Sequence, residues 1–251
     1  MRYFIDLTTV LTQKELKVRY KNSFFGYLWS IGHPLAFALV FFIAFKVIMR
    51  VQMDDYVLFL IAGLFPWQWF ANSVNMAPNI FLGNASIIKK VNFERSAGVL
   101  AAVLNETIHF AVSIPVIVFF VFYYHRGAHI SWLYGIPLLM LIQLAMTCGI
   151  ALAISSLNIF FRDLERIAVI CVTLLFYFTP VIYSPDMVPQ KYRALINLNP
   201  LAPLMGSWRS LFLDGTLDPR LVALSAVYAL VALLIGYRIY KKLVWKFAEV
   251  L

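Results

Sequence analysis

Long apolar runs alternate with short polar connections along almost the whole chain. Each run is close to the length of about 20 residues that a helix needs to cross a hydrocarbon core of about 30 Å. The pattern predicts an all-α integral membrane protein with six transmembrane helices, built as a single transmembrane domain over residues 1–251. The predicted spans are residues 29–49, 56–76, 99–123, 132–152, 167–183 and 221–240.

The basic residues are distributed unevenly between the two sides that these spans define. If the N-terminus lies in the cytoplasm, the inner segments carry about two thirds of the 21 lysines and arginines. Cytoplasmic loops of membrane proteins are enriched in these residues. The distribution therefore predicts that both termini are cytoplasmic.

Composition narrows the class of protein further. Hydrophobic residues make up 62% and charged residues 13% of the chain, against about half and a quarter in soluble domains. The spans and their connections use almost every residue, which leaves no room for a soluble catalytic domain. The net charge of +9 follows from the basic loops and gives no reason to expect a nucleic-acid partner. Cys148 and Cys171 both lie in apolar runs, so no disulfide framework is predicted.

Two segments outside the spans have patterns of their own. In residues 1–24, Phe4, Leu7, Leu11 and Val18 recur at helical spacing beside a basic strip, which predicts an amphipathic interface helix on the cytoplasmic membrane surface. Residues 184–220 are rich in proline and aliphatic side chains. A connection of this length rarely lacks structure, so we expect two short helices that dip into the outer leaflet or cap a pore.

Polar residues inside the spans are candidates for packing or for chemistry. Gln68, Asn72 and Asn75 share one helix face, as do Glu106 and His109 in the next span. Such groups face protein or water rather than lipid, and interhelical hydrogen bonds explain the amides. Glu106 with His109 is also suited to an acid/base pair.

The sequence also has a repeat of small residues in one span, and it lacks a motif for binding ATP. Ala145, Gly149 and Ala153 repeat at every fourth position, a spacing that permits close helix packing within one subunit or across a dimer. The sequence has no GxxxxGK[ST] motif, so it lacks a P-loop for ATP. Active transport would therefore draw its energy from another subunit or from an ion gradient. We expect no cofactor and no metal in this chain.

Several motifs in order resemble those of one family. The opening LKVRYKNSFFGYLW (16–29) strongly resembles that of ABC-2 type permeases that export lipid-linked polysaccharides, the O-antigen, capsule and teichoic acid exporters. Stretches similar to the family follow at the expected spacing over nearly the whole chain. They are GLFPW (63–67), IKKVNF (88–93), NIFFRDL (158–164), TPVIY (179–183), VPQKYR (188–193) and NPL (199–201).

The resemblance implies a homodimer in the bacterial cytoplasmic membrane. The two copies would engage two copies of a separate ATP-binding subunit, which would use ATP and Mg. A cytoplasmic coupling helix over residues 84–98 would dock on that subunit, and the interface helix would lie beside it. The matching coupling residues are Lys89, Lys90, Asn92, Phe93, Glu94 and Arg95. The family pattern has a proline after the aromatic residue of this loop, whereas Glu94 follows Phe93 here, so the resemblance does not fix the fine geometry of the loop.

The remaining candidate residues belong to the cytoplasmic interface or to the conduit. The basic residues of the leader are suited either to the diphosphate of a polyprenyl-linked glycan or to ordinary anionic lipid. The interface candidates are Lys14, Lys17, Arg19, Lys21, Arg162 and Asp163. Aromatic residues either form belts at the membrane surfaces or stack on sugar rings in a pore. The gate and channel candidates are Tyr27, Trp29, Trp67, Asn72, Tyr177, Tyr183, Tyr192, Asn199 and Trp208.

Two other functions stay open from the sequence. One is an ABC-2 exporter of a drug or small lipid, which composition does not separate from a glycan exporter. The other is an intramembrane polyprenyl-sugar transferase that uses Glu106 and His109 and turns over without any ATPase.

Overall fold

The computed structural model describes residues 2–20, 26–50, 55–90 and 93–250. The described residues form helices and no strands, so the prediction of an all-α protein is confirmed. The helices are α1 (Arg2–Tyr20), α2 (Trp29–Phe42), α3 (Tyr56–Met76), α4 (Asn79–Leu82), α5 (Ala85–Lys90), α6 (Ser96–Tyr123), α7 (Trp132–Asn158), α8 (Leu164–Phe178), α9 (Gln190–Leu198), α10 (Leu201–Asp214), α11 (Pro219–Leu243) and α12 (Phe247–Val250).

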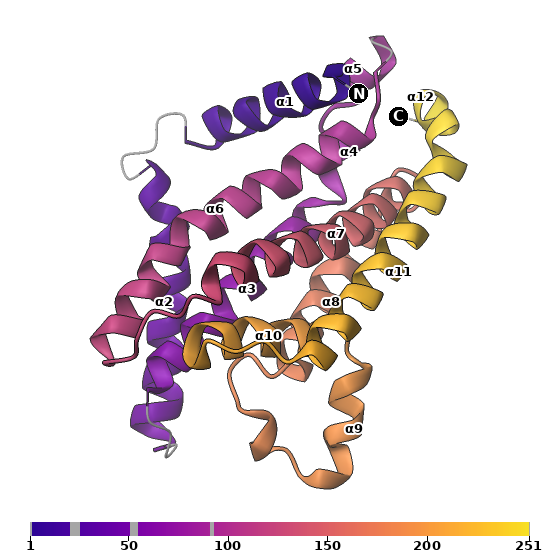
Figure 1. Cartoon of the computed structure of the whole chain (residues 1–251). Helices are drawn as coiled ribbons and strands as arrows, with labels where there is room; N and C mark the ends of the chain where they lie inside the picture. The colour runs from indigo at the N-terminus through magenta and orange to yellow at the C-terminus, as the bar shows by residue number, and fades with distance from the viewer. Residues whose placement is uncertain (1, 21–25, 51–54, 91–92, 251) are drawn as a thin grey trace.

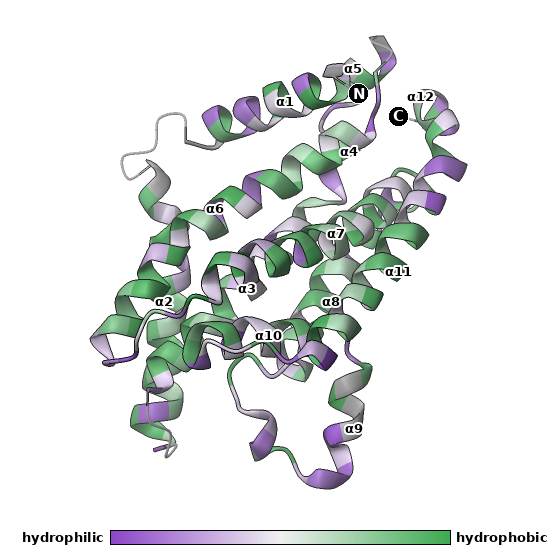
Figure 2. Cartoon of the chain, viewed as in Figure 1, coloured by the Kyte–Doolittle hydropathy of each residue, from purple (hydrophilic) through white to green (hydrophobic). Residues whose placement is uncertain are grey.

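Five segments of the described chain are long and apolar enough to cross a membrane. They are Ile31–Ile48, Tyr56–Met76, Ser96–Tyr123, Trp132–Asn158 and Pro219–Lys246. The first joins α2 to a π-helical continuation, Ile43–Ile48. Figure 2 shows long hydrophobic stretches along α6, α7, α8 and α11, with hydrophilic residues gathered on α1 and α9.

The predicted span 167–183 is not one of these five. Its helix, α8, has 15 residues and ends at Phe178, about 22 Å of helix where a full crossing needs about 30 Å. Thr179 has extended backbone (ψ 134°), because the residue before a proline is disfavoured in the helical region and Pro180 follows. The structure therefore supports five spans by length and composition, plus one shorter apolar helix.

The bundle is arranged around α3. About 78% of its apolar window is buried, against 11% for the window that contains α2. In Figure 1, α1, α5 and α12 lie toward one end of the bundle, and α9 lies at the opposite end. We call the first of these the terminal end, because both chain termini lie there.

The helix α10 is short but lies in the core. Trp208, Leu211 and Phe212 are fully buried, and α10 packs against α3, α7 and α11. Its C-terminus is closed by Gly215, which adopts a left-handed conformation (φ 64°), as is common after the last helical residue. The segment 184–220 thus holds one exposed helix, α9, and one buried helix, α10.

The closest helix pair is α7 with α11. A methyl group added at Gly236 would overlap the carbonyl oxygen of Gly149, and one added at Gly149 would overlap the backbone of Ala232. The two helices therefore meet backbone to backbone, as small residues permit. The small-residue repeat that includes Gly149 thus packs within one chain.

Candidate functional site

An open groove of about 290 Å³ lies between α2, α3 and α8. Six of the thirteen residues that line its wall carry rings, and these come from all three helices. The ring centroid of Phe176 lies 5.5 Å from that of Trp67 and also 5.5 Å from that of Phe41. The residues that line the groove include His33, Phe37, Phe41, Trp67, Gln68, Asn72, Asn75, Phe176 and Tyr177.

One stripe of this wall is polar. Gln68, Asn72 and Asn75 all come from α3 and all line the groove. Their spacing of four and three residues places them on one helix face. The Oδ1 atom of Asn75 is buried and has no hydrogen-bond partner among the described residues. The groove thus offers aromatic faces together with amides, which can both donate and accept hydrogen bonds.

Behind this stripe lies a small polar pocket. The Nδ2 atom of Asn72 donates a hydrogen bond to Oε2 of Glu106 at 3.2 Å. Glu106 and His109 are 2% and 8% exposed. The pocket that they share with Gln68 and Asn72 has a volume of about 30 Å³, which is room for about one water molecule. A sugar ring does not fit there, so the geometry does not favour the acid/base site of a transferase.

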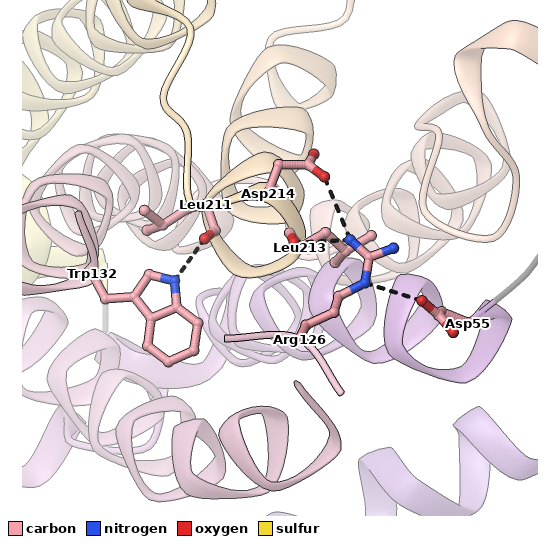
Figure 3. Close-up of polar contacts among 6 residues, drawn as sticks. All are labelled: Asp55, Arg126, Trp132, Leu211, Leu213 and Asp214. Atoms are coloured by element: carbon pink, nitrogen blue, oxygen red, sulfur yellow. Dashed lines mark hydrogen bonds and ion pairs between the residues drawn. The ribbon is translucent and has the colours of Figure 1, made fainter. Parts of the chain in front are cut away.

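The end of the bundle opposite the termini is held together by Arg126, in the α6–α7 loop. Its Nε atom lies 3.0 Å from the Asp55 carboxylate, which precedes α3, and its Nη1 donates to the Leu213 carbonyl at 2.9 Å. Figure 3 shows the guanidinium between Asp55 and Asp214, with the latter at 3.5 Å. A cation at the C-terminus of α10 also suits the helix dipole. Nearby, the Trp132 Nε1–H donates to the Leu211 carbonyl at 2.7 Å.

The predicted coupling segment is not one continuous helix. It consists of α5, a break, and the start of α6, which begins at Ser96. Lys89 is exposed on α5. Glu94 instead accepts a hydrogen bond from the hydroxyl of Tyr240 at 2.9 Å.

Arg95 makes a second tie to the C-terminal part of the chain. Its Nη1 donates to the carbonyl of Val244, and its guanidinium lies 5.8 Å from the ring of Phe247. Phe93 is half-buried and packs against a buried hydrophobic cluster that includes Tyr240 and Phe247. Glu94, Arg95 and Phe93 therefore hold the segment to α11 and α12, whereas Lys89 projects from it.

The described candidates for the cytoplasmic interface are exposed, on α1 and just after α7. Lys14 and Lys17 are exposed on α1, and Lys14 borders a groove of about 420 Å³ between α1 and the α3–α4 region. Arg162 and Asp163 are exposed just after α7. Lys21 and Asn92 lie outside the described residues, as do the side chains of Arg19, Tyr27 and Lys90.

The groove brings together Trp67, Asn72 and Tyr177 from the gate and channel candidates. Tyr183 lies next to them, since its hydroxyl donates to the carbonyl of Tyr177 at 3.2 Å. The others lie elsewhere. Trp29 is exposed at the start of α2, Tyr192 is exposed on α9, Asn199 is buried between α9 and α10, and Trp208 is buried in the core.

Asn199 and Trp208 hold α10 in place. Asn199 donates to Oγ1 of Thr179 at 2.8 Å and accepts from the Leu201 amide at 3.0 Å, at the start of α10. Trp208 donates to Oε1 of Gln143, whose Nε2 donates to the Pro66 carbonyl, both at 2.7 Å.

Several groove residues were not predicted from the sequence. Phe37, Phe41 and Phe176 are three of 22 phenylalanines. The sequence does not distinguish those that line a groove from those that face lipid or the protein core. The usable signal was the recurrence of His33, Phe37 and Phe41 at every fourth position, which places three rings on one helix face.

Comparison with known proteins identifies the family. Residues 6–213 match the model of the ABC-2 type transporter family. The chain is 47% identical over 249 residues to the O-antigen export system permease protein RfbA of Klebsiella pneumoniae, covering 99% of this chain and 96% of that protein. It is 32% identical over 222 residues to RfbA of Myxococcus xanthus, covering 86% and 85%. The polysialic acid transport protein KpsM of Escherichia coli is 23% identical over 232 residues, covering 91% and 90%. The chain is therefore a multi-pass membrane protein that belongs to the ABC-2 type transporter family.

Proposed function

We propose that this chain is the membrane-spanning permease of an ATP-driven exporter in the bacterial inner membrane. Its cargo is a polyprenyl-diphosphate-linked polysaccharide of the O-antigen kind. The near full-length similarity to O-antigen export permeases supports the class of cargo. The groove between α2, α3 and α8 carries the proposal structurally, because aromatic faces suit the C–H faces of sugar rings and amides suit their hydroxyl groups.

The proposed topology has six crossings with both termini in the cytoplasm. In this topology α8 and the residues that follow it, up to Tyr183, form the fifth crossing. The position of both termini at one end of the bundle (Figure 1) supports an even number of crossings. The terminal end, with α1, α5 and α12, is then cytoplasmic, and α9 and α10 form the extracytoplasmic gate segment.

The proposed assembly is a homodimer that closes the groove. The groove is open along one side, and the adjoining faces of α2 and α8 expose large apolar side chains. Val40, Ile170 and Leu174 are each more than half exposed. A second copy that packs on these faces would turn two half-grooves into one conduit.

The proposed energy source is a separate ATP-binding subunit, two copies per dimer, which binds ATP and Mg²⁺. It docks on the terminal end, at α5 and α1. This assignment follows from the family, whose exporters combine a permease with an ATPase, and from the absence of a P-loop motif in the sequence.

The groove makes the function testable through Tyr177. Tyr177 is 58% exposed on α8 and lines the groove, whereas Tyr134 is 59% exposed at the start of α7 and does not. Tyr177→Ala should lower the export rate about two- to tenfold, because a lost stacking contact weakens binding by that factor. Polysaccharide on the cell surface and its lipid-linked precursor in the inner membrane are measured together. Equal export by Tyr177→Ala and Tyr134→Ala would count against the groove as the conduit.

Lys89 makes the ATPase contact testable. Lys89→Glu reverses one exposed charge on α5 and leaves the ties of Glu94 and Arg95 intact. We expect about tenfold weaker co-purification of the ATP-binding subunit. The proposed contact pairs Lys89 with an acidic surface of that subunit, and a glutamate there would face like charges, which are strongly disfavoured at an interface. Lys191→Glu, an exposed charge reversal on α9 at the opposite end, is the matched control. Equal recovery of the subunit with both variants would remove α5 from the interface.

A further inference from the structure

Glu106 is a buried carboxylate about three turns into the membrane-spanning helix α6. It is 2% exposed, and no lysine or arginine is among the described residues that line its pocket. An ionisable group at this depth is costly to the membrane protein and usually serves a function. The proposed conduit does not use it directly, because Glu106 does not line the groove.

The contact between Glu106 and Asn72 gives the carboxylate a role at the groove. Asn72 lines both the groove and the small pocket, and its Nδ2 atom points to Oε2 of Glu106 at 3.2 Å. A side-chain amide has its donor group and its acceptor atom on different sides of one rigid plane. Once Nδ2 is held by the carboxylate, the carbonyl Oδ1 is turned away from Glu106.

The shape of the pocket supports this arrangement. Gln68 and Asn72 form the wall that the groove and the pocket share. The pocket has about 30 Å³ on the side of Glu106 and His109, so a water molecule fits behind the wall and a sugar ring does not. Glu106 lines the pocket and not the groove, whereas Asn72 lines both.

We infer that Glu106 is a positioning residue that holds the Asn72 amide with its carbonyl oxygen toward the groove, where it accepts a hydrogen bond from a hydroxyl group of the passing polysaccharide. The inference rests on the proposed function of the groove as the glycan conduit. It assigns a hydrogen-bond acceptor of fixed orientation to one point of the groove wall. The arrangement favours cargo sugars that present a hydroxyl donor at that point.

The test uses the complex of permease and ATP-binding subunit in proteoliposomes. The probe is lipid-linked polysaccharide purified from membranes of the source bacterium, and ATP hydrolysis is measured against its concentration. Glu106→Leu should raise the apparent KM for the polysaccharide about three- to tenfold, the effect of one lost hydrogen bond. The maximal stimulated rate should change less than twofold. Glu106→Gln should restore the KM, because its side-chain carbonyl can still accept from Asn72.

Asn72→Ala, alone and combined with Glu106→Leu, distinguishes a failure of the proposed conduit from a failure of the positioning role. Asn72→Ala should raise the KM as much as Glu106→Leu, and the two changes together should raise it no further. If Asn72→Ala leaves the KM unchanged, the groove is not the conduit and the proposed function of the groove fails. If Asn72→Ala raises the KM but Glu106→Leu does not, or if the two effects multiply, only the positioning role fails.

A purely structural role for Glu106 predicts a different pattern. It would lower the amount of folded complex and the maximal rate while the KM stayed the same. Glu106→Met, which keeps a flexible side chain of similar length, replaces Glu106→Leu if the latter does not yield folded complex. An unchanged KM in either folded variant overturns the inference.

Discussion

Gly236→Ala is expected to destabilise the protein by forcing α7 and α11 apart. The added carbon would overlap the carbonyl oxygen of Gly149, and both groups belong to the backbone of a long helix. No side chain can rotate to make room, so the two helices would have to separate. Overpacking of a well-packed interior costs about 1–3 kcal/mol, and backbone clashes lie at the upper end. The effect is measured as the shift in the midpoint of thermal unfolding in detergent, with the loss of folded protein monitored by size-exclusion chromatography.

Gly98→Ala is the matched control for this prediction. Gly98 is also in a long apolar helix, α6, but its added carbon would lie 3.8 Å from the Ile80 side chain, an ordinary contact. Replacing a helical glycine by alanine there should be neutral or stabilise the helix by about 0.5–1 kcal/mol. Gly149→Ala should behave like Gly236→Ala. Unfolding of Gly236→Ala at the same temperature as Gly98→Ala would contradict the close crossing of α7 and α11.

Hydropathy predicted the long helices because their apolar composition alone places them in a membrane. The predicted span 56–76 has the same bounds as α3. The short helix α8 shows the limit of this reasoning. An average over apolar residues treats Thr179 and Pro180 as part of the run, whereas the proline ends the helix through local backbone sterics.

The candidate residues could be predicted one by one, but their contacts could not. Asn72 and Glu106 stood out because polar groups in apolar helices are few, but their mutual hydrogen bond depends on how α3 and α6 pack. Glu94 shows the same dependence. The family resemblance implied a docking residue there, and the contact of Glu94 with Tyr240 joins residues far apart in the chain. Neither pairing has a local signal in the sequence.

Arg209, in the segment 184–220, is one of the most constrained side chains among the described residues. It is 7% exposed, and its guanidinium lies 3.6 Å from the centroid of the Phe59 ring. It donates to the carbonyls of Pro180 and Val181, both at 2.8 Å, and to that of Phe59 at 3.3 Å. The first two carbonyls belong to the turn where α8 ends, so Arg209 supplies donors that the broken helix lacks.

Arg209→Met is therefore expected to destabilise the protein by about 3–5 kcal/mol. Methionine keeps much of the volume but leaves buried carbonyl groups without donors, at about 1–3 kcal/mol for each unsatisfied group, and it removes the cation–π contact. Arg209→Lys should recover only part of the loss, because a single ammonium group does not reproduce the planar fork of the guanidinium.

The matched control is Arg193→Met on α9. Arg193 also donates to backbone carbonyls, those of Val188 and Asp186 at 3.0 Å, but it is exposed, so water replaces its hydrogen bonds and the change should stay within about 0.5 kcal/mol. Thermal unfolding of the two variants in the same detergent decides the matter, and equal midpoints would contradict the structural role of Arg209. Arg209 does not line the groove, but α8 carries Tyr177, which does. A looser turn after Phe178 would shift α8, so the Arg209→Lys protein that still folds should also export less polysaccharide.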